Sequence, residues 1–282
     1  MRKSVRILCI IFVVSAVAGA AVFFFGISDE LKVQKYDIDA PEINKNIRIA
    51  FVSDLHSNNW GENMELIVDE IDRQEPDILL LGGDLFGYSY DDKNAEVFLN
   101  GISGRYPCYY ATGNHEFWCG EQLYLQKMEL LGKYEVTRLS GEAETITVNG
   151  EKLNICGVDD PDAMDYTDAI TENFVEQLKK VNDKAANGNY TVLLSHRPEK
   201  MNDYSQYDFD LVLSGHAHGG QWRFPPLING LYAPHQGLFP KYAGGRYEEN
   251  GTVMIVSRGL ALEAESIPRV YNRPELVIID LH

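Results

Sequence analysis

The chain has 282 residues, 45% of them hydrophobic, and a formal net charge of −17 at pH 7. That length suits one sizeable hydrophobic core. The negative charge disfavours a nucleic-acid substrate, because it repels a polyanion unless a local basic patch offsets it. One of the four cysteines, Cys9, lies in an apolar run, and the odd number left excludes a full disulfide framework. Cys108 and Cys119 could pair, although a buried free thiol is the commoner state for a strand cysteine.

The N-terminal residues form an apolar run that predicts a transmembrane anchor over residues 1–27. Residues 7–27 are apolar except for Ser15 and small residues, long enough to cross a bilayer at about 1.5 Å per residue. A cleaved signal ending at Ala16-Val17-Ala18 is the alternative, but the apolar run continues to Phe25. We expect residues 28–46 to form a tether, which could include an edge strand.

The charges that flank this run predict the orientation of the anchor. Basic residues precede it and acidic residues follow it: Arg2, Lys3 and Arg6, then Asp29 and Glu30. The positive-inside rule places the N-terminus in the cytoplasm. The sequence therefore predicts a single-pass cell-membrane protein whose main domain, after the anchor, lies outside the cytoplasm.

Five apolar segments read as β-strands, and each leads into a polar cluster. The segments are residues 47–52, 77–81, 108–111, 190–194 and 209–213. The polar residues that follow them are, in chain order, Asp54, His56, Asp84, Asn114, His196, His216 and His218. Strands of an open α/β sheet bring their carboxyl ends to one edge, where such proteins build their sites. A single Asp or His here is more often a turn residue or an ordinary histidine, but the conjunction predicts a site for two metal ions.

The segments between these strands predict helices and one hairpin. Apolar residues recur on one face at Met64, Ile67 and Ile71, and again over residues 170–181. Residues 145–158 alternate around Asn149-Gly150, the signature of a hairpin. Alternating strands and helices predict an α/β fold. Because the metal-binding residues span residues 54–218, we expect one catalytic domain over residues 47–282.

The motifs occur in the order found in a known family. They are Asp-x-His at 54–56, Gly-Asp at 83–84, Gly-Asn-His-Glu at 113–116, a lone His196, and Gly-His-x-His at 215–218. From residue 47 onward the chain resembles the calcineurin-like metallophosphoesterases. It is similar in particular to a bacterial branch of membrane-associated phosphodiesterases that includes UDP-2,3-diacylglucosamine diphosphatases, with Ala217 in place of that branch's threonine. The resemblance implies a four-layer αββα sandwich of two mixed β-sheets flanked by helices.

The resemblance also implies how the ions are held and used. One ion would be bound by Asp54, His56, Asp84 and His218, and the other by Asp84, Asn114, His196 and His216. These donors suit manganese first, with zinc or iron as alternatives. A water molecule shared by the ions would attack phosphorus directly, without a covalent enzyme intermediate.

His115 resembles the family histidine that assists the leaving group, and this chain departs from the family beside it. Many relatives have Gly-Asp-x-x-Asp, whose second aspartate orients that histidine, but Gly87 stands at that position here. Asp91, Asp92 or Glu116 could take over its role, or backbone and solvent could hold His115.

The expected substrate is a phosphodiester or pyrophosphate in a lipid or cell-envelope polymer, because an anchor concentrates the site near the bilayer. The aromatic, glycine-rich residues beyond Gln221 suit a loop-rich wall of the site. Arg223, Lys241 and Arg246 could contact substrate phosphate, or be solvated surface residues. Two alternatives remain, a catalytically weak metal-binding scaffold and a metallonuclease.

Overall fold

The computed structural model describes residues 12, 19, 23–87, 91–264 and 267–282. Residues 1–11, 13–18 and 20–22 of the predicted anchor lie outside the described residues, and its membrane-spanning role stays a prediction. Among the helices that are described, none is both long enough and apolar enough to span a bilayer.

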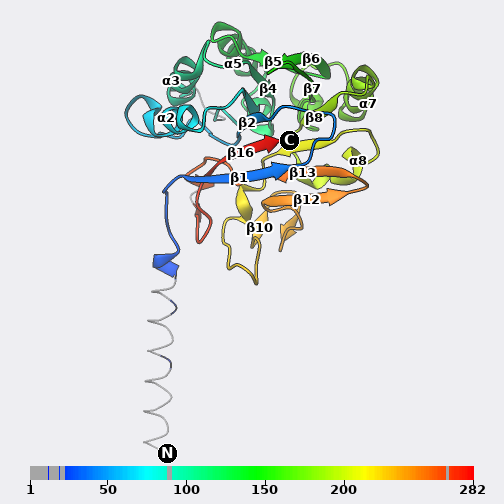
Figure 1. Ribbon diagram of the computed structural model, residues 1–282. Helices are drawn as coiled ribbons and strands as arrows, with labels where there is room; N and C mark the ends of the chain where they lie inside the picture. The colour runs from blue at the N-terminus through cyan, green and yellow to red at the C-terminus, as the bar shows by residue number, and fades with distance from the viewer. Residues whose placement is uncertain (1–11, 13–18, 20–22, 88–90, 265–266) are drawn as a thin grey trace, which may run out of the picture.

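Two six-stranded sheets pack face to face (Figure 1). The first has the order β1-β16-β2-β3-β4-β5, and the second has the order β12-β13-β9-β8-β7-β6. The strands of the first are β1 Lys32–Ile38, β2 Ile47–Val52, β3 Ile78–Gly82, β4 Cys108–Ala111, β5 Thr137–Arg138 and β16 Glu275–Leu281. Those of the second are β6 Glu142–Val148, β7 Glu151–Gly157, β8 Tyr190–Leu194, β9 Leu211–Ser214, β12 Gly245–Glu249 and β13 Thr252–Val256.

Helices cover the outer face of each sheet. Against the first sheet lie α2 Glu65–Gln74, α3 Lys93–Ile102 and α5 Glu121–Lys133, and against the second lie α7 Phe174–Ala185 and α8 Met201–Tyr204. The shorter elements are α4 Asn114–Trp118, α6 Ala163–Tyr166, η1 Glu62–Met64, η2 Pro198–Lys200 and η3 His218–Gly220. Two small ribbons pair β10 Tyr232–Ala233 with β11 Gly237–Leu238, and β14 Glu263–Ala264 with β15 Ile267–Pro268.

Side-chain alternation along the strands builds the layers. On β2, Ile49 and Phe51 point into the core between the sheets, whereas Ala50 and Val52 face the core under the helices. Both faces are buried, as expected for a sheet sandwiched between two layers. The α/β sandwich predicted from the sequence is confirmed, as are the five predicted strands.

Three predicted details can be compared directly with the fold. The hairpin forms from β6 and β7, and Asn149 and Gly150 both have positive φ, 55° and 90°, as a tight I′ turn requires. The edge strand that residues 28–46 could include is present, because β1 pairs in parallel with β16 at the edge of the first sheet. Cys108, Cys119 and Cys156 are free thiols, so the Cys108–Cys119 pairing left open by the sequence does not form.

Candidate metal centre

The predicted ligands lie where parallel strands end. Strands β2, β3 and β4 are parallel neighbours in one sheet, and β8 and β9 are parallel neighbours in the other. Their carboxyl ends therefore deliver polar residues to one edge of the sandwich. Several of these residues adopt left-handed backbone, with φ of 51° at Asp54, 47° at His56, 50° at Asp84, 65° at His216 and 45° at His218. Such strain is tolerated where the surroundings enforce it, commonly at functional sites.

Asp84 lies at the centre of the cluster. Its Oδ2 is 3.2 Å from His196 Nε2, 3.6 Å from His56 Nε2 and 3.9 Å from His115 Nε2. Its Oδ1 accepts a hydrogen bond of 2.9 Å from the backbone N–H of His115. One carboxylate thus faces histidines delivered by three separate strand ends.

Asp54 is the second carboxylate of the cluster. Its Oδ1 accepts the backbone N–H of His216 at 2.9 Å and lies 3.5 Å from His218 Nε2. The Nε2 atoms of His56 and His218 are 3.4 Å apart. Asp54, His56 and His218 therefore converge, and Asp84, His196 and His216 form a second converging group.

The unused donor atoms of the cluster fit a pair of cations. Among the described residues, the buried atoms Asp54 Oδ2 and Asn114 Oδ1 have no hydrogen-bond partner, which is costly unless something else binds them. His196 Nδ1 lies 2.7 Å from the carbonyl oxygen of Gly82 and donates to it, which leaves Nε2 as the ring nitrogen able to coordinate a metal. Carboxylate, amide and imidazole donors in this mixture suit borderline divalent metals.

Burial and mutual charge set the protonation of these groups. Burial lowers the pKa of His56 to about 3 and holds those of His216 and His218 well below the usual range, so all three are neutral. Burial also acts to lower the pKa of His196, but the carboxylate of Asp84 outweighs it and raises that pKa to about 10. The same pairing outweighs burial at Asp84 and holds the pKa of that carboxyl well below normal.

His115 is positioned by aromatic contacts. Its ring lies 4.4 Å from the ring of His56 in an edge-to-face arrangement and 5.0 Å from that of Trp118. His115 therefore lies beside the group formed by Asp54, His56 and His218, with its Nε2 facing Asp84. Trp118, the last residue of α4, is a contact that sequence reasoning missed, although its spacing of three from His115 is that of helix neighbours.

Two of the candidates for orienting His115 have other partners. Buried Glu116 accepts three backbone N–H groups, those of Asp84 at 2.9 Å, Gly113 at 2.8 Å and Phe86 at 3.1 Å. Asp92 accepts the backbone N–H of Gly87 at 3.1 Å. Glu116 therefore ties the loop after β3 to the loop after β4, which positions Asp84 and Asn114 together.

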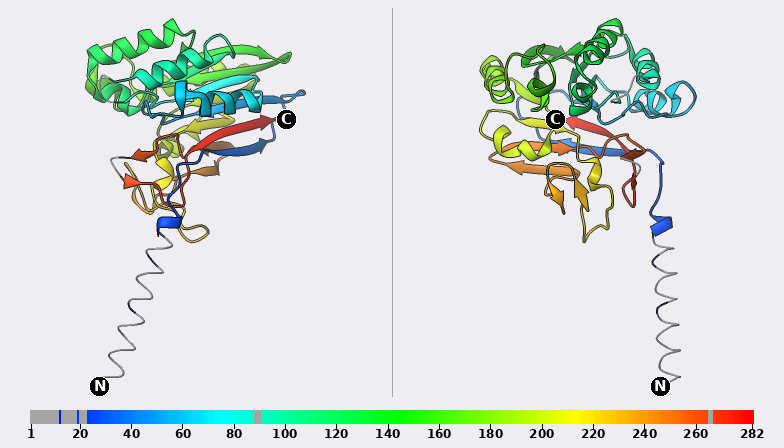
Figure 2. Two further views of the ribbon diagram at one scale, coloured as in Figure 1. Left: turned by 90° about the vertical axis from the view of Figure 1, so that its left-hand side faces the viewer. Right: turned by 180° about the vertical axis from the view of Figure 1, so that it is seen from behind.

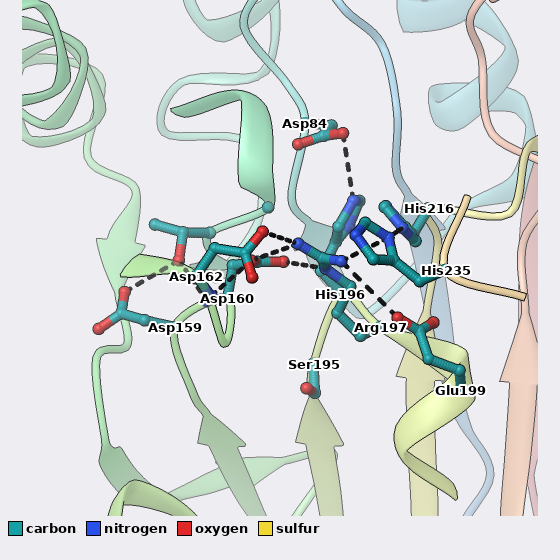
Figure 3. A network of polar contacts seen from close by, with 12 residues as sticks. Asp84, Asp159, Asp160, Asp162, Ser195, His196, Arg197, Glu199, His216 and His235 are labelled. Atoms are coloured by element: carbon teal, nitrogen blue, oxygen red, sulfur yellow. Dashed lines mark hydrogen bonds and ion pairs between the residues drawn. The ribbon is translucent and has the colours of Figure 1, made fainter. Parts of the chain in front are cut away.

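A buried arginine supports the other side of the cluster (Figure 3). Arg197 pairs with both oxygens of Asp160 at 2.6 and 2.8 Å and with Asp162 at 2.6 Å. Its Nη1 lies 2.7 Å from His235 Nδ1, which is itself 3.0 Å from His216 Nε2. Because a guanidinium only donates, His235 Nδ1 is the acceptor in this contact.

Glu199, His216 and His235 also converge closely enough to hold an ion. The guanidinium of Arg197 lies 3.7 Å from Glu199 and 2.7 Å from His235, so a positive charge already sits among them. We therefore place no third ion there. Sequence reasoning missed both Arg197 and His235. No spacing pattern marks an isolated histidine in a loop, and Arg197 meets His235 only in the folded chain.

Comparison with known proteins decides the family. The model of the calcineurin-like phosphoesterase family matches residues 47–220. The chain belongs to the calcineurin-like phosphoesterase family. It is a metallophosphoesterase, a metal-dependent phosphoric ester hydrolase.

The relatives carry little functional detail. An uncharacterized metallophosphoesterase of Aquifex aeolicus is 30% identical over 89% of this chain and 92% of its own length. One of Campylobacter jejuni is 29% identical over 98% of this chain and 71% of its own. Among solved structures, a 5′-nucleotidase precursor of Thermus thermophilus matches 77% of this chain and 49% of its own with a TM-score of 0.55, but at 16% identity this likeness shows the fold alone.

The three basic residues suggested for substrate binding lie on the second-sheet side of this metallophosphoesterase. Arg223 donates to Asn229 Oδ1, Arg246 pairs with Glu248 at 2.8 Å, and exposed Lys241 lies 3.7 Å from Glu249. Within the described part of the chain, no hydrogen bond or ion pair joins them to the metal cluster, and their binding of substrate stays a prediction.

Proposed function

We propose that this metallophosphoesterase uses two divalent ions to hydrolyse a phosphodiester or pyrophosphate bond in a lipid-linked or cell-envelope substrate. The observation that supports two ions is the placement of Asp84. Its Oδ2 faces His196, a member of one donor group, and His56, a member of the other. A carboxylate with two oxygens can serve two cations at once.

We assign the ligands as two sets that share Asp84. Asp54, His56, Asp84 and His218 would hold one ion, and Asp84, Asn114, His196 and His216 the other. When bound, the ions would neutralise phosphate charge and lower the pKa of a water molecule. Manganese is our first choice, with zinc or iron as alternatives, since the donors are mixed oxygen and nitrogen.

The side chains of the protein have distinct parts in the reaction. Asp84 and Asp54 fix the spacing of the histidines, and the Gly82 carbonyl fixes the tautomer of His196. His115 would stabilise or protonate the leaving oxygen, held by the rings of His56 and Trp118. The nucleophile we propose is water, so no covalent enzyme intermediate forms.

The substrate class rests on the N-terminal apolar run. We propose that residues 1–27 anchor the protein in the cell membrane, with the catalytic domain over residues 47–282 outside the cytoplasm. Confinement at the bilayer raises the effective concentration of lipid-linked substrates. A lipid-headgroup pyrophosphate, of the kind that the resemblance to UDP-2,3-diacylglucosamine diphosphatases suggests, is one member of this class.

Turnover on a defined panel tests the proposal. The full chain in detergent would be stripped of ions with a chelator, reloaded with manganese, and assayed on nitrophenyl phosphate, bis(nitrophenyl) phosphate and a lipid-linked pyrophosphate. We expect the diester or the pyrophosphate to be hydrolysed faster than the monoester, and the chelated protein to be inactive. A monoester preference would contradict the bond type, ion binding without turnover would support the scaffold alternative, and faster cleavage of single-stranded DNA would support a nuclease.

A further inference from the structure

Apolar side chains protrude from the loops that follow the last metal ligands. Leu227 is 88% exposed, Leu238 68%, Phe239 64% and Tyr232 49%. We call these four residues the apolar rim. Exposed apolar residues are ordinary when scattered, but these lie within 13 residues of one another in sequence, and Tyr232 and Leu238 are cross-strand partners. A cluster of this kind marks an interaction surface.

A chain of contacts joins the loops of the rim to the start of the described domain. The ring of Trp222 lies 5.2 Å from that of Phe23, and Ile27 bridges to Val270. The backbone N–H of Arg223 in turn donates to the Val270 carbonyl at 2.9 Å. The loops of residues 221–243 lie at the end of the molecule from which residues 23–27 leave (Figures 1 and 2).

The charge around the rim differs from that of the whole chain. The protein has 42 Asp and Glu residues and a net charge of −17, yet residues 211–247 contain neither Asp nor Glu. Basic residues in that stretch are Arg223, Lys241 and Arg246. Arg246 pairs with Glu248 and Lys241 lies 3.7 Å from Glu249, both just beyond the stretch. The segment that carries the rim therefore brings no acidic residue of its own toward phosphate headgroups, which attract basic side chains.

The same loops border the metal centre. His235 lies between β10 and β11, the ribbon that carries Tyr232 and Leu238, and its Nδ1 is 3.0 Å from His216 Nε2. Leu231 donates its backbone N–H to the Gly220 carbonyl at 2.9 Å, two residues beyond His218. A molecule in contact with the apolar rim would therefore lie near the metal-binding residues.

We propose that the apolar rim inserts into the headgroup region of the lipid bilayer that the N-terminal run enters. Apolar tips flanked by basic residues are the composition of an interfacial contact. The rim would dock the domain against the membrane and present the metal centre to headgroup phosphates, so the second contact complements the anchor. This inference rests on the membrane location in the proposed function.

Photocrosslinking of the full chain in vesicles tests the rim. Vesicles would contain equal amounts of phosphatidylglycerol and phosphatidylethanolamine, and p-benzoylphenylalanine would be introduced in place of Leu238. The control position is Val175 on α7, which is 56% exposed and lies outside the rim loops. We expect a lipid adduct from position 238 at least about 10-fold above that from position 175, because interfacial binding scales with buried apolar area.

A second variant distinguishes membrane contact by the apolar rim from anchoring by the N-terminal run. With the probe in place of Leu227, the Leu238→Asp, Phe239→Asp double variant is expected to lose most of the lipid adduct while still floating with the vesicles and still hydrolysing soluble bis(nitrophenyl) phosphate. Equal lipid adducts at positions 238 and 175 would contradict insertion of the apolar rim into the bilayer. Adducts at position 238 with a second copy of the chain would contradict it as well. Failure of the unaltered protein to float would overturn the membrane location as well, whereas loss of soluble diester turnover reports on the proposed chemistry alone.

Discussion

His115 is the residue whose role in chemistry can be separated from metal binding. If it protonates the leaving oxygen, His115→Ala should slow hydrolysis of an alkyl phosphoester by about 100-fold or more. A nitrophenyl ester should be slowed much less, because nitrophenolate leaves without help. The ratio of the two losses in kcat/KM is the measurement, and equal losses on both esters would remove the acid role.

His196 is the histidine expected to release a proton when ions bind. Burial acts to lower its pKa, but Asp84 raises that pKa to about 10, so it is charged at neutral pH without an ion. An ion needs the neutral ring, so binding near pH 7 should expel about one proton from His196, and affinity should rise with pH toward 10. His56, with a pKa of about 3, is already neutral and should contribute none.

Proton release can be followed with a pH indicator in weak buffer during manganese addition. The His196→Asn variant should lose this release, whereas His56→Asn should keep it. Affinity that falls as the pH rises from 7 to 9 would contradict the protonation state assigned to His196.

At the scale of elements, the loops after β3 and β4 must approach closely. A Cβ at Gly113 would overlap Asp84 Oδ1 and the backbone nitrogen of Asp84. We therefore expect Gly113→Ala to lower the free energy of unfolding by about 1–3 kcal/mol and to weaken ion binding, because the Asp84 carboxylate must move.

The matched control is Gly132 in α5, where an added Cβ would meet nothing within 4 Å. Gly132→Ala should raise the free energy of unfolding by about 0.5–1 kcal/mol, since Ala favours the helix. Denaturant unfolding and metal titration of both variants provide the comparison. Unchanged ion binding in Gly113→Ala would mean that the two loops are less constrained than they appear in the fold.

The same elements explain which parts of the site the sequence could predict. Asp54, Asp84 and His196 each follow a largely apolar strand, so the strand ends bring them together. Glu116 is adjacent to His115 in sequence, but its carboxylate faces backbone N–H groups, a direction that local spacing cannot specify. Arg197 and His235 meet only through tertiary packing, and the parallel pairing of β1 with β16 joins opposite ends of the chain.

At the scale of the whole molecule, the predicted orientation makes the catalytic domain accessible from outside. Protease added to intact cells stripped of their wall should digest the domain, because the positive-inside rule predicts that Arg2, Lys3 and Arg6 stay in the cytoplasm. Lysed cells give the digestion control. Full protection before lysis would reverse the orientation and move the enzyme to the cytoplasm.

The central claim is that two ions share Asp84, and counting ions in an Asp84 variant tests it most directly. The control is Asp210→Ala, which removes a carboxylate that accepts the backbone N–H of Thr191 at 2.7 Å and belongs to neither donor group. We predict two manganese ions per chain in the unaltered protein and in Asp210→Ala, and loss of both ions and of diester hydrolysis in folded Asp84→Ala. Full ion occupancy with unchanged hydrolysis in Asp84→Ala would contradict the account.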